Sequence, residues 1–416
     1  MVFFCLTVKY ICYLINDYDI YLRLKLEDAI LEFLFRRNNM SHIFLASPHM
    51  SDEGYEQEFI KEAFDTNWIA PLGRNVNEFE NEMISKLNVK AAVALSCGTA
   101  AIHMALKSIG IKQGDPVFCQ SLTFSASANP IVYEKGIPVF IDSDESWNMS
   151  PKALKKGLEK YKDNLPKAVI VVHLYGLAVN IDEIRAICDD YGVPLIEDAA
   201  ESLGTMYKGQ CTGTFGDYSI ISFNGNKIIT TSGGGMLLVN TDDAGDKAKK
   251  VLFWATQARE QARHYEHKEI GYNYRMSNIV AGIGRGQLKV LDQRVEKKRY
   301  IYKYYQKELG DLEGFNLMPR DMYDSYSNCW LTAAELDERS KVRPIDIMIA
   351  LEENDIESRP VWKPMHLQPV FNDCDYIDNG KISERLFNNG ICLPSDTKMT
   401  DDDLNRVCNI IKGLYK

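Results

Sequence analysis

One lysine, Lys227, stands between two apolar segments of this sequence. The segment "YSIIS" ends five residues before it, at Ser222, and "GMLLVN" begins eight residues after it, at the last glycine of a triplet. Both segments have the continuous apolar composition of buried strands. A solvated charge is out of place there, whereas a desolvated amine is suited to reaction with a carbonyl group. The lysine therefore marks a candidate site of covalent chemistry.

Polar residues follow three other apolar segments. Gly98 and Thr99 stand where "AAVALS" gives way to a helical pattern, and the free N–H groups of a helix N-terminus bind phosphate. Asp198 ends "VPLIED", and His173 follows "AVIVV". Each residue alone is as well explained by a helix cap or a surface charge. Together with Lys227 they match the needs of pyridoxal phosphate: an amine for a Schiff base, an acid for the ring nitrogen and donors for the phosphate.

The elements that carry these residues alternate along the chain. Apolar runs typical of buried strands begin near residues 91, 116, 137, 168 and 193, and segments with helical spacing lie between several of them. This alternation predicts an α/β fold with a mostly parallel sheet and helices on both faces. Ligands of such sheets bind at the carboxyl ends of the strands, where the polar residues above are expected to meet.

Composition excludes several classes of function. The chain has 416 residues, 45% of them apolar and 25% charged, as in ordinary globular proteins. Its net charge of −10 argues against binding to nucleic acid or to an acidic membrane. The ten cysteines form no CxxC pair, so we expect reduced thiols and a cytoplasmic protein. The close histidine pair in "HYEH" fits a polar segment better than a metal site, and no metal is predicted.

The chain divides into three parts. Residues 1–39 contain an apolar stretch that charges interrupt, too short to span a bilayer and without a cleavage site. We expect a dispensable leader there, and a membrane-surface anchor is the less favoured alternative. Residues 40–293 are predicted to form a large cofactor-binding domain and residues 294–416 a smaller C-terminal α/β domain.

From Met40 onward the sequence resembles the nucleotide-sugar aminotransferases of the DegT/StrS type, which are fold-type I pyridoxal-phosphate enzymes. The resemblance rests on motifs in their family order: "NWIAPLGRNVNEFE", "LSCGTAAIHMAL", "LTFSASANPIVYEKGIPVFIDSD", "HLYG", "IEDAAESLGTMYKG", "GTFGDYSIISFNGNKIITTSGGGM" and "EIGYNYRMSNIVAGIGRGQ". Within the family, "ATQAREQARHYEH", "ESRPVWKPMHLQPVF" and "ICLPSDTKMT" look most like the enzymes of the UDP-N-acetylbacillosamine type. Residues 1–39 have no counterpart in the family.

The resemblance implies a role for each site residue. Lys227 matches the Schiff-base lysine, and Asp198 matches the carboxylate that faces the ring nitrogen. The residues that match the phosphate site are Gly98, Thr99, Ala100 and Ser222. Phe124 matches an aromatic residue that stacks on the ring, and Glu201 matches a further cofactor contact. Glu201 falls where many relatives carry glutamine.

Asn273 matches a residue that reaches the phosphate of a neighbouring subunit's cofactor, and Arg275 is a second candidate for that contact. The resemblance thus implies a homodimer with shared active sites. The predicted sugar-nucleotide contacts are Arg359, Trp362, His366 and, more weakly, His267. An arginine fork suits a diphosphate, although a surface cation and core packing explain Arg359 and Trp362 as well.

The implied reaction transfers the amino group of L-glutamate to the 4-keto carbon of a UDP-4-keto-6-deoxy-2-acetamido hexose, for glycan or polysaccharide synthesis. Lys227 would move a proton between the donor's α-carbon and C4′ of the cofactor. Alternatives that remain are amination or dehydration of another nucleotide-linked keto sugar, GDP- or dTDP-linked, and a non-catalytic relative. One branch of the family has histidine in place of the lysine and dehydrates its substrate, so the lysine favours transamination.

Overall fold

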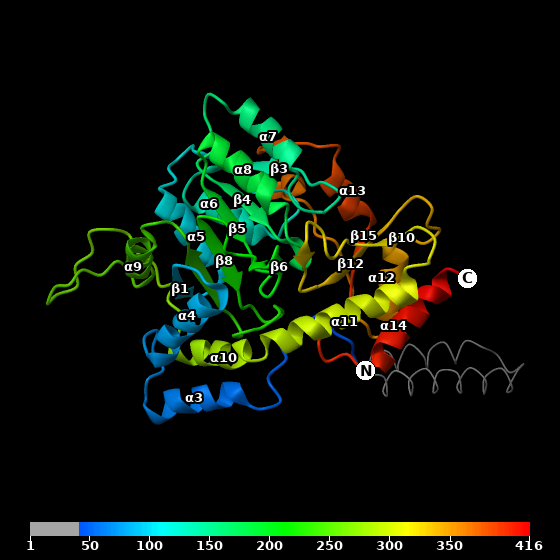
Figure 1. Ribbon diagram of the computed structural model, residues 1–416, viewed down its shortest axis with the longest axis horizontal. Coiled ribbons are helices and arrows are strands. Elements are labelled where there is room, and N and C mark those ends of the chain that lie inside the picture. The colour runs from blue at the N-terminus through cyan, green and yellow to red at the C-terminus, as the bar shows by residue number, and fades with distance from the viewer. Residues whose placement is uncertain (1–40) are drawn as a thin grey trace, which may run out of the picture.

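The computed structural model describes residues 41–416 (Figure 1). The leader predicted at residues 1–39 lies outside the described residues. The helices are α3 (Tyr55–Asp65), α4 (Arg74–Leu87), α5 (Gly98–Ile109), α6 (Asn129–Tyr133), α7 (Pro151–Lys160), α8 (Ile181–Tyr191), α9 (Ala244–Ala255), α10 (Asn278–Leu288), α11 (Leu291–Leu309), α12 (Pro344–Glu353), α13 (Ile382–Asn389) and α14 (Asp401–Leu414). Short 3-10 turns include η1 (Ser125–Ser127) and η2 (Leu174–Gly176).

The strands are short, and most of them alternate with the helices. They are β1 (Ala91–Leu95), β2 (Pro116–Gln120), β3 (Ile137–Ile141), β4 (Val169–Val172), β5 (Leu195–Asp198), β6 (Met206–Tyr207), β7 (Gln210–Cys211), β8 (Tyr218–Ser222), β9 (Gly235–Val239), β10 (Phe315–Leu317), β11 (Ser325–Tyr326), β12 (Thr332–Leu336), β13 (Arg359–Pro360), β14 (Asp375–Ile377) and β15 (Gly390–Leu393).

An eight-stranded sheet forms the centre of the molecule, in the order β1-β9-β8-β5-β4-β2-β3-β14. β9 pairs antiparallel with both of its neighbours, β1 and β8, and the other pairs in the sheet are parallel. The fold class predicted from the alternation of strand and helix patterns is therefore confirmed.

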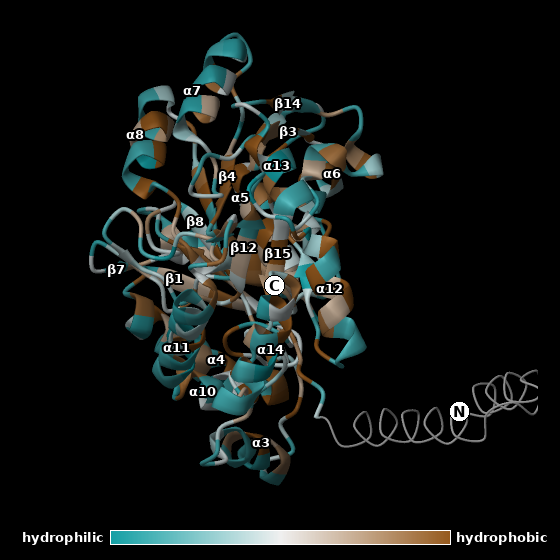
Figure 2. Cartoon of the chain, turned by 90° about the vertical axis from the view of Figure 1, so that its right-hand side faces the viewer, coloured by the Kyte–Doolittle hydropathy of each residue, from teal (hydrophilic) through white to brown (hydrophobic). Residues whose placement is uncertain are grey.

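Both faces of this sheet are apolar because both are covered by helices. In β1, Ala92 and Ala94 pack with residues of α4, whereas Val93 and Leu95 pack with residues of α5 on the opposite face. Alternate residues of a strand point to opposite faces, so a strand covered on both sides is apolar throughout. Figure 2 shows the consequence: brown strands lie inside, and the outer helix surfaces are largely teal.

A second sheet, β10-β12-β15-β13, belongs to the C-terminal part of the chain. α11 runs from the neighbourhood of α10 to this sheet and packs there against α14 (Figure 1). The two parts are interleaved, since β14 pairs in parallel with β3 of the large sheet and β11 pairs with β6. The domain boundary at 293/294 stays a prediction, and α11 spans it.

The parallel strands end at one edge of the large sheet. There β1 leads into α5 at Cys97, while β5 ends at Asp198 and β8 at Ser222. The topology thus brings together residues that are far apart in sequence. No helix within residues 41–416 is long and apolar enough to cross a membrane.

Candidate active site

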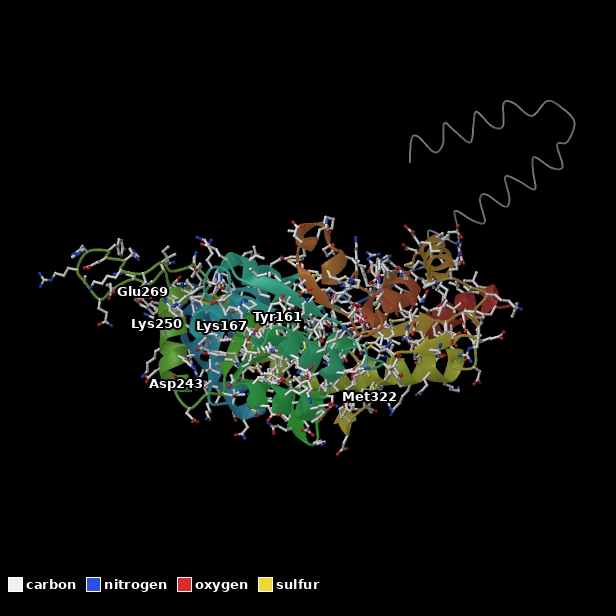
Figure 3. The ribbon with its side chains drawn as sticks, turned by 90° about the horizontal axis from the view of Figure 1, so that it is seen from above. Tyr161, Lys167, Asp243, Lys250, Glu269 and Met322 are labelled. Atoms are coloured by element: carbon white, nitrogen blue, oxygen red, sulfur yellow. The ribbon has the colours of Figure 1, made fainter. Side chains whose placement is uncertain are left out.

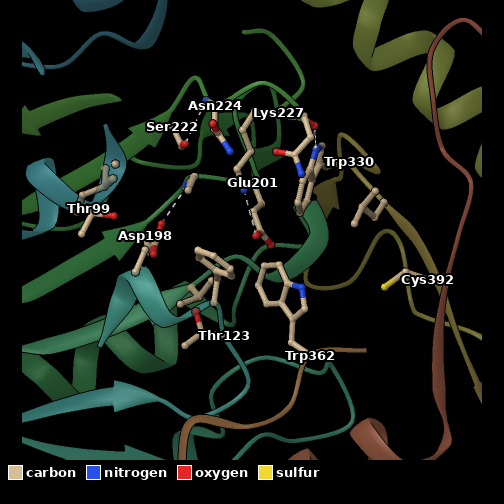
Figure 4. A pocket seen from close by; sticks show the side chains of 18 of the residues that line it. Thr99, Thr123, Asp198, Glu201, Ser222, Asn224, Lys227, Trp330, Trp362 and Cys392 are labelled. Carbon is tan, nitrogen blue, oxygen red and sulfur yellow. Dashed lines mark hydrogen bonds and ion pairs between the residues drawn. The ribbon is translucent and has the colours of Figure 1, made fainter. Parts of the chain in front are cut away.

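A cavity of about 710 Å³ opens at this sheet edge, between the large sheet and the C-terminal part (Figure 4). Most residues predicted for the site line it: Gly98, Thr99, Phe124, Asp198, Glu201, Ser222, Lys227, Arg359 and Trp362. Its size is that of a pocket for a small organic ligand. Within residues 41–416, no group of three or more His, Cys, Asp and Glu side chains could hold a metal ion.

The N-terminus of α5 forms one end of the cavity. The helix begins at Gly98, and its first backbone N–H groups have no partner within the helix. Ser222 lies directly against this turn: a Cβ atom on Gly98 would meet the Ser222 Cβ at 3.4 Å. Backbone donors, a hydroxyl group and the positive end of a helix dipole suit a phosphate group. Ala100 is buried just behind, and its N–H contacts the Cys97 Sγ at 3.4 Å.

The glycine triplet lets β9 approach this turn closely. A Cβ atom on Gly235 would come within 2.3 Å of the Cys97 carbonyl carbon and 2.4 Å of the Gly98 nitrogen. Neither atom is a flexible side-chain end, so the backbone itself would have to move. Glycine is therefore required at position 235 to keep the turn between β1 and α5 in place.

Replacing Gly235 with alanine is expected to weaken cofactor binding by about 10- to 100-fold, because displacing packed backbone costs about 1–3 kcal/mol. Fluorescence titration of the free protein with pyridoxal phosphate measures this change. Gly245→Ala in α9 is the matched control, since an added Cβ meets nothing within 4 Å there. Equal affinities of wild type and Gly235→Ala would contradict the role of the triplet.

Asp198 lies at the floor of the cavity with only 4% of its surface exposed. It accepts hydrogen bonds from the Ser127 hydroxyl at 2.7 Å and the Ala200 N–H at 3.1 Å. Burial raises the pKa of Asp198, and the bond from Ser127 offsets this only in part. Within residues 41–416 no cation forms an ion pair with Asp198, and such a buried carboxylate is suited to pair with a protonated ring nitrogen.

Lys227 enters the cavity opposite Asp198, with 12% of its side chain exposed. Its Nζ lies 3.3 Å from Glu201 Oε1 and 4.0 Å from the centre of the Trp330 ring. Figure 4 shows the lysine directed between these two side chains. Glu201 is 3% exposed, and burial raises its pKa to about 7.

The raised pKa of Glu201 makes the stability of the cofactor-free chain pH-dependent. In the unfolded chain the carboxyl group ionises near 4.5, and in the folded chain near 7. Between these two pH values the folded chain binds a proton at Glu201 that the unfolded chain does not bind. The free energy of unfolding therefore falls as pH rises from about 4.5 through about 7. Glu201→Gln removes this titration. The melting temperature of the variant minus that of wild type should therefore be several degrees larger at about pH 8 than at about pH 5. Calorimetry that finds a constant difference would contradict the prediction.

Aromatic side chains form the cavity wall that faces the sheet edge. Phe124 is 58% exposed, and its ring centre lies 5.6 Å from that of Trp362. Trp362 also contacts Tyr175 at 5.1 Å, edge to face. An exposed aromatic face beside an acid and an amine can stack on a flat heteroaromatic ring.

Two cations lie at the side formed by the C-terminal part, where Arg359 and Lys363 line the cavity. The Arg359 side chain is 63% exposed, and its Nη2 lies 3.9 Å from Glu357 Oε1. Sequence reasoning missed Lys363, Trp330 and Tyr175. Two of them stand within motifs quoted above, Lys363 in "RPVWKPMH" and Tyr175 in "HLYG", whereas Trp330 stands in none.

Besides Ala100, three residues predicted for the site do not line this cavity. The ring of His366 is 7% exposed, stacks on Tyr376 at 3.6 Å and contacts the Ser121 hydroxyl at 2.6 Å. Burial lowers the pKa of His366, which fits a neutral packing residue. His267 is exposed on the segment that follows α9, where its Nδ1 lies 2.9 Å from the Gln257 carbonyl oxygen.

Asn273, the third, is exposed at the end of the same segment. Residues 257–273 project away from the body of the molecule in Figures 1 and 3, and Lys250 pairs with Glu269 at 2.5 Å near their base. Arg275 is buried and paired with Glu80 in its own chain. Of these two candidates for a contact to a second subunit, only Asn273 is exposed.

The residues of the cavity fit pyridoxal phosphate. An amine, a buried acid without a cation, an exposed aromatic face and an anion-binding helix turn open into one space. Each corresponds to one part of that cofactor: the aldehyde, the ring nitrogen, the ring face and the phosphate.

Comparison with known proteins supports the same conclusion. EpsN of Bacillus subtilis, whose name assigns it to the pyridoxal phosphate-dependent aminotransferases, is 55% identical over 379 residues, 90% of this chain and 96% of EpsN. A GDP-perosamine synthase of Vibrio cholerae is 36% identical over 87% of this chain and 97% of its own length. A UDP-4-amino-4,6-dideoxy-N-acetyl-beta-L-altrosamine transaminase of Campylobacter jejuni is 35% identical over 57% and 62%.

A crystal structure of a DegT DnrJ EryC1 StrS aminotransferase from Brucella abortus superposes with a TM-score of 0.80 at 27% identity, over 87% of this chain and 96% of the other. The model of the DegT/DnrJ/EryC1/StrS aminotransferase family matches residues 51–412. The resemblance seen in the motifs and the expected cofactor are thereby confirmed: the chain belongs to this family of pyridoxal phosphate-dependent sugar aminotransferases.

Proposed function

We propose that this protein transfers the amino group of L-glutamate to the 4-keto carbon of a nucleotide-linked 4-keto-6-deoxy sugar. The observation that carries the proposal is the placement of Lys227 Nζ, Asp198 and the α5 N-terminus in one cavity that cations border on its outer side. That the chain is a sugar aminotransferase follows from its family. The carbon that receives the amino group and the identity of the sugar nucleotide belong to the proposal.

Each side chain has a defined task. The N–H groups at the start of α5 and the Ser222 hydroxyl hold the cofactor's phosphate, and Phe124 covers its ring. Asp198 stabilises the protonated ring nitrogen, which supplies the counter-charge that the buried acid lacks. When bound, the cofactor withdraws electrons from the carbon that loses its proton and stores the amino group between the two half-reactions.

Lys227 binds the cofactor and carries the proton. Its neutral amine takes a proton from the α-carbon of glutamate at Nζ and would deliver it to a different carbon, C4′ of the bound cofactor. In the second half-reaction the same amine moves a proton in the opposite direction, onto the sugar carbon that receives the amino group. The flanking aromatic walls exclude water from the proton during these steps.

Arg359 and Lys363 provide the charge for binding both substrates. A guanidinium group binds a diphosphate through two hydrogen bonds, and a neighbouring ammonium adds a second positive charge. Glutamate also carries a carboxylate at the end distant from its amino group. One pair of cations at the cavity rim therefore suits the anionic end of the donor and of the acceptor, which enter in turn.

The acceptor we favour is a UDP-linked 4-keto-6-deoxy-2-acetamido hexose, on the basis of "ATQAREQARHYEH", "SRPVWKPMH" and "ICLPSDTKMT". The Campylobacter jejuni transaminase, named for a UDP-linked N-acetyl sugar, supports this choice over part of the chain. The Vibrio cholerae relative, which the chain matches over 97% of its length, favours a GDP-linked sugar as the second candidate.

A competition between these sugars decides between the two. The kcat/KM for the UDP-linked acetamido keto sugar is expected to exceed that for GDP-linked 4-keto-6-deoxymannose by at least about 10-fold. A site that pairs polar groups with the acetamido group leaves them unpaired with the other sugar. Release of 2-oxoglutarate from glutamate gives the rate. A ratio near or below one would reject this acceptor, and absence of 2-oxoglutarate with every keto sugar would reject transamination.

We further propose a homodimer in which Asn273 reaches the cofactor phosphate of the partner, and a cytoplasmic location. The projecting segment 257–273 and its exposed Asn273 support the shared site (Figure 1). Two alternatives are dehydration of the sugar, which the presence of Lys227 disfavours, and a non-catalytic role, which the presence of Lys227, Asp198 and Ser222 together disfavours.

A further inference from the structure

Two side chains hold the amine of Lys227 from different sides. The indole ring of Trp330 lies with its centre 4.0 Å from Nζ, and Glu201 Oε1 lies 3.3 Å from the same nitrogen. Lysine has a long stem with many rotamers, so an amine with both contacts is fixed at some cost in entropy. The π face of an indole and a carboxylate both attract the charged form of the amine.

Trp330 is itself fixed to the segment that carries the lysine. Its ring is 2% exposed, and its Nε1–H donates to the carbonyl oxygen of Asn226 at 2.8 Å, one residue before Lys227. Its backbone N–H donates to Asn328 Oδ1 at 2.9 Å. The bond to Asn226 therefore ties the ring to the residue that precedes Lys227.

Glu201 is fixed from its other side. The N–H of Tyr175 donates to Glu201 Oε2 at 2.8 Å, and Tyr175 has a left-handed backbone with φ of 51°. That conformation is uncommon for a bulky residue, and here it accompanies the bond to the carboxylate. The charged groups that act on Glu201 are Lys227 and Asp198, and Glu201 in turn adds to the burial that raises the pKa of the Cys392 thiol.

We propose that Trp330, acting with Glu201, is a positioning residue that keeps Lys227 at the cavity wall while Nζ holds the proton. This inference rests on the proposed function. There the amine becomes an ammonium when it takes the proton of the donor's α-carbon, and it must then deliver that proton to a second carbon. A desolvated ammonium would otherwise lose its proton or swing away. The indole face and the carboxylate stabilise that charge in a fixed direction.

The decisive test measures the reactivity of Lys227 in the cofactor-free protein with an acylating reagent, by mass spectrometry of its peptide. Only the neutral amine reacts, so a group that stabilises the ammonium slows labelling. Replacing all five tryptophans with a fluorinated tryptophan keeps the shape of the indole and weakens its negative face. Lys227 should then label several-fold faster at about pH 8, while the exposed Lys155 in α7 serves as the internal control and keeps its rate.

Glu201→Gln provides the second arm, because it keeps the side-chain shape and removes the charge. At about pH 8 Lys227 should label several-fold faster than in wild type, and at about pH 5.5, where Glu201 is protonated, the two rates should agree. A merely structural role of Glu201 would not produce this pH dependence. Glu335→Gln is the matched control, since Glu335 is a half-buried acid paired with Arg385 at 2.9 Å outside the cavity.

Trp330→Phe and Trp330→Leu connect labelling with turnover. Phenylalanine retains a π face and should retain most of kcat, whereas leucine should lower kcat about 10-fold with little change in the KM for the sugar. Unchanged labelling of Lys227 in both the fluorinated protein and Glu201→Gln would overturn the inference. Because labelling needs neither cofactor nor substrate, that result would leave the proposed function standing, and failure of transamination would leave the labelling result standing.

Discussion

Replacing Lys227 with arginine is expected to lower kcat/KM for amino transfer by at least about 10³-fold. Arginine keeps the positive charge and nearly the length of the side chain, but its guanidinium group neither binds the aldehyde nor releases a proton near neutral pH. The variant therefore loses the covalent link and the proton carrier together. Its contacts to Glu201 and Trp330 can persist, because a guanidinium also suits a carboxylate and an indole face.

Turnover is measured as 2-oxoglutarate released from glutamate, with the sugar product followed separately. Lys155→Arg in α7 is the matched control, since Lys155 is exposed and does not line the cavity. Circular dichroism and titration with pyridoxal phosphate check that Lys227→Arg still folds and still binds the phosphate end. A folded variant within about 10-fold of wild type would show that another group transfers the proton.

Asp198→Asn is expected to lower kcat by about 10²- to 10⁴-fold while the fold is retained. Asparagine has the shape of aspartate and can still accept the hydrogen bond from Ser127. It cannot stabilise a protonated ring nitrogen, so the ring withdraws electrons less strongly. The loss should appear in kcat more than in the KM for either substrate, because binding of the sugar nucleotide does not involve this position.

Asp144→Asn is the matched control for this variant. Asp144 is a half-buried acid whose pKa burial raises, and it accepts hydrogen bonds from the N–H and hydroxyl groups of Ser146 outside the cavity. Its replacement should leave turnover unchanged. If Asp198→Asn were as active as Asp144→Asn, the ring nitrogen would have to be stabilised by a different group.

The central sheet could be predicted from sequence because its strands are buried on both faces. Continuous apolar runs such as "AAVAL" and "VIVV" have that composition only when helices cover both sides, as the alternate packing of β1 shows. The same logic placed Asp198 and Ser222 at strand ends, and the structure brings both to the cavity. The short strands β11 and β14 pair with β6 and β3, which lie far from them in the sequence. Neither strand has a continuous apolar run that would have predicted it.

The part of the site that sequence did not reveal depends on tertiary contacts. Trp330 stands about a hundred residues from Lys227, and an apolar tryptophan beside a strand is more typical of a core residue. Only the packing of "SNCW" against Asn226 brings its ring to the amine. His366 illustrates the reverse: its motif places it near the site, yet stacking on Tyr376 turns the ring into the interior.

Borohydride reduction of the holoenzyme followed by peptide mapping tests the assignment of Lys227 most directly. Reduction fixes the cofactor to the amine that holds it, so the labelled residue is read from the mass of one peptide. We expect the pyridoxyl group on Lys227, within "SFNGNKIITTSGGGM", and no label after incubation with excess glutamate, which converts the cofactor to its unattached amine form. A pyridoxyl group on any other lysine, or a label that glutamate leaves unchanged, would contradict the assignment.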